Sequence, residues 1–264
     1  MLICAISFSF VLALQIIMQL EAGMESFLAT KSTIGENLGM GAWSLPHILW
    51  LLAGALFTCV MALAYRHSGS PGRKRLAWTV AGLTLADEAV KYIITIPAGL
   101  WEWGYLPLHL CSLSVFMILA HVLTDDDRVA EALYGLSLPS ALMALIFPNW
   151  MMLPCMNWQS IHSFSIHLLI VTYPVMLLAG GFRPRFSRLL YSFPPLLLAM
   201  LVAAVVNSLL GTNFFFLNTG EAGNPLAFAE ALVGGWYVLT LPLAAAILWT
   251  VMYLVPKKLR WLQQ

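Results

Sequence analysis

Long apolar runs, separated by short polar segments, dominate the pattern of this chain. A helix of about 20 apolar residues crosses a hydrocarbon core of about 30 Å. Turn-forming or charged segments such as "HSGSPGRKR" and "GGFRPRFSR" end several of the runs. The runs are Trp43–Tyr65, Leu76–Ile96, Leu106–Thr124, Ala130–Phe147, Ile161–Gly180, Leu189–Leu210 and Ala229–Val255. They predict an all-α fold, a polytopic membrane bundle of seven transmembrane helices.

A further apolar run, "MLICAISFSFVLALQIIMQL", opens the chain. It lacks the basic start and the small-residue cleavage site of a secretory signal. Residues 1–23 are therefore either an eighth span or an extension that the folded core does not need. Residues 24–264 contain no soluble domain and no long linker, so we expect them to form a single transmembrane domain.

Composition narrows the classes of protein further. The chain is 61% hydrophobic and 9% charged, which is too apolar for one water-soluble core. No Lys or Arg block stands outside the short loops, which argues against a nucleic-acid partner. The four cysteines show no paired spacing, so the sequence indicates neither a disulfide framework nor a structural metal site. We expect no cofactor and no metal, and the sequence leaves the oligomeric state open.

The basic residues predict the orientation in the membrane. Between the first and second spans, between the fifth and sixth, and after the seventh they are Arg66, Arg73, Lys74, Arg75, Arg183, Arg185, Arg188, Lys257, Lys258 and Arg260, and all of these fall on one side of the predicted bundle. The opposite loops "PAGLWEWGY", "PNWMMLPCMNWQS" and "GTNFFFLNTGEAGNPLAF" contain no Lys or Arg. The positive-inside rule makes the basic side cytoplasmic. We therefore expect a multi-pass protein of the cell membrane whose carboxy terminus is cytoplasmic.

Polar residues from separate spans fall at one depth near the outer side. They are His47, Asp87, Glu88, Lys91, His109, Cys111, His162, His167, Asn207, Asn213 and Asn218. Ionisable groups are costly in a bilayer and usually face the bundle interior or a wet cavity. This convergence predicts one functional layer. Simpler interpretations remain: Asp87 and Lys91, four residues apart, neutralise each other on one helix face, and a single Cys or His serves only packing or interhelical hydrogen bonding.

Three motifs carry a family resemblance. "LPLHLCS", "IHSFSIHLLIV" and "VNSLLGTNFFFL", the last followed by "GGWYVL", resemble the YwaF-like bacterial integral membrane proteins. Those are in turn similar to a eukaryotic multi-pass acyltransferase of the transmembrane protein 164 type, which moves polyunsaturated acyl chains onto ether phospholipids. The resemblance runs from about His47 to the carboxy terminus. One departure is Phe214, where the family tends to have an aromatic hydroxyl; another is "GGWY" in place of a proline-containing run.

The resemblance implies a membrane phospholipid as substrate and assigns roles to residues. Cys111 would take the acyl chain and His167 would be its partner. The surrounding substrate-binding residues would be His109, His47, Glu88, His162 and Asn213. The reaction would be acyl transfer, or hydrolysis through a thioester, near the outer leaflet.

A Cys–His pair is chemically reasonable at these positions. A thiol is only a few per cent thiolate at neutral pH, so an imidazole is needed to take its proton. His109 lies about 200° from Cys111 if both are on one helix, so the base should come from another span. Ser163 shares a helix face with His167 and is predicted to orient its ring. Pro107 suits the first turn of the helix that carries Cys111.

Two other classes of function remain open from the sequence. Three histidines and a carboxylate at one depth suit a metal-dependent membrane hydrolase, although no HExxH-like pair is present. Seven spans with the amino end outside also suit a non-enzymatic transporter or receptor, although the two halves show no repeat.

Overall fold

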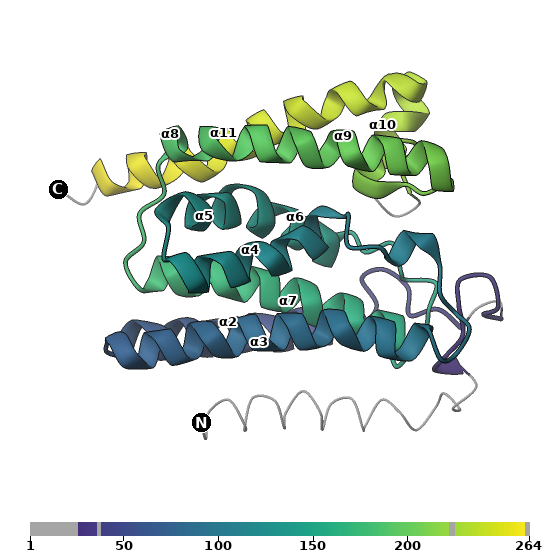
Figure 1. Cartoon of the computed structure of the whole chain (residues 1–264), viewed down its shortest axis with the longest axis horizontal. Coiled ribbons are helices and arrows are strands. Elements are labelled where there is room, and N and C mark those ends of the chain that lie inside the picture. Colours follow the sequence, from purple (N-terminus) through teal and green to yellow (C-terminus); the bar gives the residue numbers. More distant parts are fainter. Residues whose placement is uncertain (1–25, 36–37, 222–224, 262–264) are drawn as a thin grey trace.

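A computed structural model describes residues 26–35, 38–221 and 225–261 of the chain, and every regular element in these ranges is helical (Figure 1). The longer elements are α2 (Leu45–His67), α3 (Ser70–Thr95), α4 (Leu110–Thr124), α5 (Asp127–Ala132), α6 (Leu138–Ile146), α7 (Trp158–Ala179), α9 (Phe193–Leu210), α10 (Pro225–Val233) and α11 (Thr240–Trp261). The shorter ones are η3 (Trp103–Tyr105), η4 (Leu133–Ser137), α8 (Phe186–Leu189), η5 (Leu190–Ser192), η6 (Phe214–Phe216) and η7 (Gly234–Leu239). The all-α prediction is confirmed. Residues 1–23, predicted to be either an eighth span or a dispensable extension, lie outside the residues that the structure describes.

Six helical segments of the described chain are long and apolar enough to cross a membrane. They are Leu45–His67, Trp103–Thr124, Asp127–Ile146, Trp158–Ala179, Phe186–Leu210 and Pro225–Leu254. The chain is therefore a multi-pass membrane protein. Helix α3 is long as well, but it carries acidic and basic residues along its length. The count of seven spans thus stays a prediction.

The helices form three layers (Figure 1). Helices α2 and α3 make one outer layer, and α9 and α11 make the other, with α10 at one end. Between them lie α4, α5, α6 and α7, and α7 contacts α2, α3, α4 and α6. Its side chains Phe164, Ile170, Tyr173 and Met176 are fully buried. Because α7 is the central helix, the polar residues near its start face the interior of the bundle.

A proline interrupts the span that runs from Asp127 to Ile146. Pro139 has no N–H group, so the carbonyl of Gly135, four residues earlier, loses its normal helical donor. The chain forms a π-helical turn here, and the indole Nε1–H of Trp249 on α11 donates to the Gly135 carbonyl at 2.7 Å. Such π-helical turns occur frequently at functional sites.

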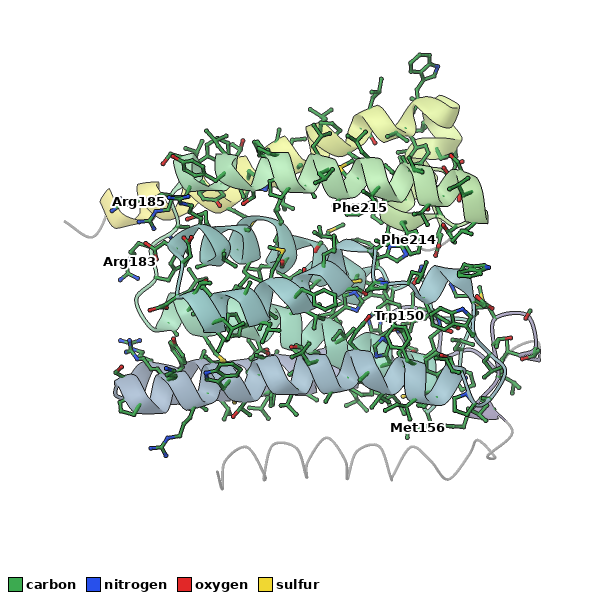
Figure 2. The ribbon with its side chains drawn as sticks, in the orientation of Figure 1. Trp150, Met156, Arg183, Arg185, Phe214 and Phe215 are labelled. Atoms are coloured by element: carbon green, nitrogen blue, oxygen red, sulfur yellow. The ribbon has the colours of Figure 1, made fainter. Side chains whose placement is uncertain are left out.

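Basic groups gather at one end of the bundle, as predicted. Arg73, at the start of α3, donates from Nη1 to the carbonyl of Gly180 at 2.9 Å, which holds the α2–α3 turn against the end of α7. Arg183 and Arg185 follow α7 directly, and Figure 2 shows them far from Trp150 and Phe214 at the other end. The assignment of this basic end to the cytoplasm stays a prediction.

The same end holds a buried carboxylate. Glu131 on α5 is fully buried, its Oε1 accepts from the Tyr253 hydroxyl at 2.6 Å, and its Oε2 accepts from the backbone N–H of Arg185 at 2.8 Å. Glu131 thus fastens α11 and the segment before α8 to the middle layer. The α9–α11 layer is held close to the rest of the bundle at this end. Farther along, a cavity separates the two.

Candidate functional site

A cavity of about 1730 Å³ lies between α9 and α11 on one side and α4, α6 and α7 on the other. Its polar lining residues include Glu88, Lys91, His109, Cys111, Ser112, His162, Ser163, His167 and Asn213. They come from the last turns of α3, the start of α4, the first turns of α7 and the segment after α9, which meet at one end of the bundle (Figure 1). The walls from α9 and α11 are almost entirely apolar. The cavity is therefore amphipathic, with its polar groups gathered near one end.

Cys111 is partly buried in the first turn of α4 and lines this cavity. Helix α4 begins at Leu110, so the prediction that Pro107 lies in its first turn is wrong. Proline disfavours helical backbone in the residue before it, and Leu106 has an extended ψ of 144°. His109 is extended as well, with ψ of 153°, so the helix starts only after it, and this places the thiol at the very beginning of the helix, beside the polar end of the cavity.

His167 on α7 lines the same cavity with an oriented ring. Its Nδ1 lies 2.5 Å from the backbone carbonyl oxygen of Ser163. A carbonyl oxygen only accepts, so Nδ1 carries the proton and Nε2 is the basic nitrogen. The ring also stacks on Trp150, with centroids 5.5 Å apart and planes at 15°. Ser163 orients the ring through its carbonyl rather than through its hydroxyl.

His109 is the N-cap residue of α4 and lies outside the helix. The helical angle that predicts its side chain to point away from Cys111 therefore does not apply, because the His109 backbone is extended, with ψ of 153°. Its ring packs against Phe214 and Phe216 of η6, at centroid distances of 5.0 and 5.7 Å. His109 thus joins the start of α4 to the segment that follows α9.

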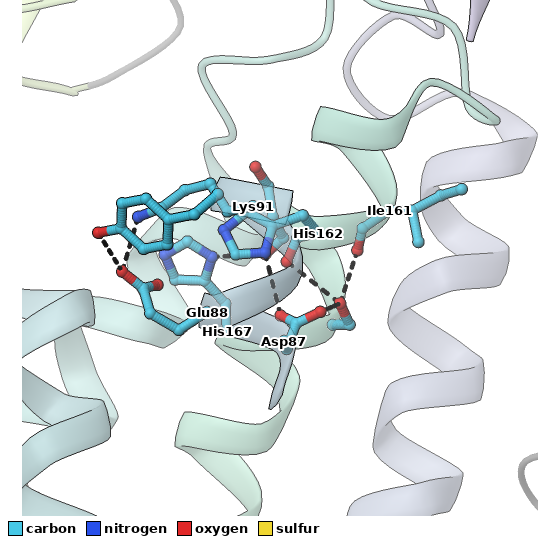
Figure 3. Close-up of polar contacts among 9 residues, drawn as sticks. Asp87, Glu88, Lys91, Ile161, His162 and His167 are labelled. Carbon is cyan, nitrogen blue, oxygen red and sulfur yellow. Dashed lines mark hydrogen bonds and ion pairs between the residues drawn. The ribbon is translucent and has the colours of Figure 1, made fainter. Parts of the chain in front are cut away.

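Two pairs of ionisable side chains lie beside the cavity, and both appear in Figure 3. The Lys91 ammonium lies 2.6 Å from Glu88 Oε1, and both side chains are buried. Asp87 faces α7 instead, where His162 Nδ1 lies 3.2 Å from its Oδ2 and the Ser165 hydroxyl donates to its Oδ1 at 3.0 Å. The predicted pair of Asp87 with Lys91 is therefore wrong. The buried Lys91 ammonium thus has a carboxylate beside it, since an unpaired buried charge is costly.

The structure does not bring His47 to this cavity. His47 is fully buried at the start of α2, where Nδ1 accepts from the Trp43 N–H at 3.0 Å and Nε2 donates to the Leu145 carbonyl at 2.9 Å. Both ring nitrogens are thus satisfied, and the imidazole links α2 to α6.

Asn213 does line the cavity, and its side chain also shapes the segment around it. Its Oδ1 accepts from the N–H of Asn218 at 3.0 Å and of Thr219 at 3.2 Å, and its Nδ2 donates to the Thr219 carbonyl at 2.9 Å. These three bonds close a turn at the mouth of the cavity.

Asn207 belongs to the predicted polar layer but has no role in the predicted Cys–His site, and the structure shows it to be a structural determinant. It is buried near the end of α9, where its Oδ1 accepts from the Phe214 N–H at 2.7 Å and from the Thr212 hydroxyl at 2.9 Å, and its Nδ2 donates to the Phe214 carbonyl at 3.0 Å. These bonds hold Phe215 and Phe216 at φ of 56° and 55°, in the left-handed region that aromatic residues rarely adopt. The "NSLLGTN" run is the sequence signal for this arrangement.

Outside the spans, Cys155 in the α6–α7 connection has a different environment. Burial raises the pKa of its thiol, and the Trp50 Nε1–H donates to the sulfur at 3.3 Å. This thiol therefore packs against α2. Among the described residues, no three His, Cys, Asp or Glu side chains converge as a group that could hold a metal ion.

The sequence model of the TMEM164 family matches residues 42–253. The chain belongs to the TMEM164 family. No curated protein and no solved structure matches it. The family match confirms the transmembrane protein 164 part of the resemblance, and the YwaF-like part stays a prediction. The matched region contains every residue of the cavity's polar end discussed above.

One residue of this TMEM164 chain departs from the pattern that the resemblance describes. Phe214 stands where the family tends to have an aromatic hydroxyl, and here its ring is fully buried and packs against His109. The phenyl ring offers His109 an apolar contact and no hydrogen bond. The His109 nitrogens in this member of the family thus receive no hydrogen bond from position 214.

Proposed function

We propose that this TMEM164-family protein is an acyltransferase that acts on the acyl chains of membrane phospholipids through Cys111 and His167, near the outer leaflet. The observation that carries the proposal is the shared cavity: a thiol and an imidazole, from two different helices, line one end of a long apolar chamber. At about 1730 Å³ the chamber exceeds the range of about 300–1,000 Å³ that is typical of small-molecule sites. Its size and its apolar walls suit a lipid.

In the first step, the sulfur of Cys111 attacks the carbonyl carbon of a phospholipid ester while Nε2 of His167 takes the thiol proton. The tetrahedral intermediate collapses with cleavage of the carbon–oxygen ester bond. The leaving oxygen takes the proton from the imidazolium and departs as the hydroxyl of a lysolipid. The products of this step are a thioester on Cys111 and neutral His167.

The second step reverses the roles with a new acceptor. The hydroxyl of an acceptor lipid gives its proton to Nε2 of His167, and its oxygen attacks the thioester carbonyl. The carbon–sulfur bond breaks, and the sulfur recovers the proton from the imidazolium. Water in place of the acceptor hydroxyl would give hydrolysis, so acyl transfer requires that the cavity favours lipid over water.

Two features of His167 support its role as the base. The Ser163 carbonyl fixes the proton on Nδ1, so Nε2 is unprotonated when the thiol is neutral. The parallel ring of Trp150 holds the imidazole plane in one orientation.

The buried ammonium of Lys91 lines the same cavity and would stabilise the negative charge that develops on the carbonyl oxygen. Glu88, His109, His162 and Asn213 would contact the polar parts of the lipid.

The decisive experiment is the detection of the thioester. Purified protein in lipid nanodiscs is incubated with a phospholipid that carries an isotopically labelled acyl chain, and the peptides are analysed by mass spectrometry. We expect a labelled acyl group on the Cys111 peptide that hydroxylamine removes. The Cys155 peptide serves as the internal control and should stay unmodified. An unmodified Cys111 under conditions in which the wild-type protein alters membrane lipids would exclude this mechanism.

A further inference from the structure

We infer that the inner part of the cavity is the binding site for one long acyl chain and that Trp249, with Gly135 and Phe193, forms the end wall that limits the length of that chain. The identity of the ligand as an acyl chain rests on the proposed function. The position of the wall rests on contacts that are independent of it.

Trp249 is fixed in place from two sides. Its indole Nε1–H donates to the Gly135 carbonyl, whose usual donor four residues later is replaced by Pro139. The Phe193 ring at the start of α9 lies 5.4 Å from the Trp249 ring, centroid to centroid. Trp249, Gly135, Phe193 and Pro139 all line the cavity. The wall therefore joins α11, α9 and the interrupted helix through a rigid contact.

The bundle is closely packed behind this wall. On the Gly135 side Leu189, Tyr134 and Tyr253 are buried and none of them lines the cavity, whereas Leu190, just before Phe193, still lines it. A methyl group added at Gly135 would lie 2.6 Å from Leu189 Cδ1 and 2.9 Å from the Tyr253 hydroxyl, which shows how little space remains. A chain that enters from the polar end and follows the Gly135 side therefore meets Trp249 and cannot pass between it and Gly135.

The distance along the bundle from the Cys111 thiol to the end wall follows from one hydrogen bond between two helices. The hydroxyls of Ser114 on α4 and Ser137 in η4 lie 2.8 Å apart, so these two residues share one depth. Cys111 lies three residues outward of Ser114, and Gly135 lies two residues inward of Ser137. At 1.5 Å per residue, the wall is about 8 Å deeper than the thiol. A long chain must therefore bend along the apolar faces of α9 and α11.

Chain length should consequently determine binding until the space is filled. Relative to fatty acid that is free in water, each methylene group buried in the apolar chamber should strengthen binding roughly fourfold. Once the chain reaches the wall and fills the chamber, a further methylene should add nothing. A plot of binding strength against chain length should thus rise and then reach a break point.

The test measures that break point. Straight-chain saturated fatty acids, each two methylenes longer than the last, compete with radiolabelled palmitic acid for the full chain in nanodiscs, and each affinity is expressed relative to the free fatty acid in water. Trp249→Ala should move the break point to longer chains, and Trp249→Phe, which keeps most of the ring volume, should leave it near the wild-type position. Ala245→Phe, which fills the cavity, should move it to shorter chains. Ala246→Phe is the matched control, because Ala246 is exposed and does not line the cavity.

The outcomes separate this inference from the proposed function. The same break point in wild type, Trp249→Ala and Ala245→Phe would overturn the end wall, even if the thioester on Cys111 is found. Shifted break points without a thioester would support the acyl-chain site and would contradict the proposed acyltransferase mechanism through Cys111. If Trp249→Ala fails to fold, Ala245→Phe against Ala246→Phe still decides the question.

Discussion

The imidazole of His167 lies parallel to the indole of Trp150, at a centroid distance of 5.5 Å and an interplanar angle of 15°. A small error in the position of a catalytic group costs up to about 100-fold in rate. We therefore expect Trp150→Ala to lower kcat by about 10- to 100-fold and to change KM little. Trp150→Phe should stay within a few-fold of wild type, because it keeps an aromatic face and because the Trp150 Nε1–H has no acceptor among the described residues. Equal losses in the two variants would show that stacking does not position the imidazole.

The paired chemistry of Cys111 and His167 predicts non-additive kinetics. Cys111→Ser should lower the rate of acyl transfer by about 1,000-fold or more, because a serine hydroxyl is far less acidic than a thiol. His167→Ala should lose nearly as much, and the double variant should lose little more than either single one, because the two residues act as a unit. Lipid mass spectrometry of nanodiscs gives the rates, and thermal unfolding shows that the variants fold. Additive losses would mean that the two residues act separately.

The buried carboxylate of Glu131 should contribute to stability at the basic end. Glu131→Ala removes two hydrogen bonds and should lower the free energy of unfolding by about 3 kcal/mol. Glu131→Gln keeps an acceptor and should cost about 1 kcal/mol. The control is Asp127→Asn, since Asp127 pairs with Arg188 at 2.7 Å but its side chain is 58% exposed, and it should change stability by less than about 1 kcal/mol. Denaturant unfolding in detergent measures all three, and a similar cost for Asp127→Asn and Glu131→Ala would contradict the role of Glu131.

The orientation of the bundle predicts opposite labelling at its two ends. A cysteine in place of Gly69, in the α2–α3 turn, should resist a membrane-impermeant thiol reagent in intact cells. A cysteine in place of Thr219, near the mouth of the cavity, should react. Both positions are exposed, and an added Cβ at Gly69 meets no other atom within 4 Å. The reversed pattern would place the cavity mouth on the cytoplasmic side.

The first residues of the chain should be dispensable up to a definite point. Asn157, which caps α7, donates to the carbonyls of Ser26 and Ala29 at 2.9 and 2.8 Å. A chain that begins at Met24 retains both acceptors, so we expect unchanged insertion and thermal stability. A chain that begins at Lys31 loses both and should unfold at a lower temperature. Failure of the Met24 chain to insert would identify residues 1–23 as a span or an insertion signal.

The sequence predicts the class of fold because the bilayer imposes a local rule. A helix must satisfy its own backbone groups and must span about 30 Å, so each apolar run is visible without knowledge of its neighbours. The same rule makes buried ionisable residues conspicuous, which is why Glu88, His109, Cys111, His162 and His167 are all identified from the sequence and all line one cavity.

Local rules fail where partners come from other helices. Spacing alone favours Asp87 with Lys91, but the rotation of α3 turns Asp87 toward His162 on α7 and leaves Lys91 with Glu88. His47 is predicted at the same depth as the polar residues of the cavity, but its Nε2 donates to the Leu145 carbonyl on α6 and the ring lies outside the cavity.

The cavity itself is decided only by the tertiary structure. Sequence determines that the walls are apolar and that Pro139 removes a donor from its helix. Only packing decides that Trp249, more than a hundred residues later in the sequence, donates to the Gly135 carbonyl and lines the cavity there, because helix packing angles and rotations depend on all the side chains at the contact together.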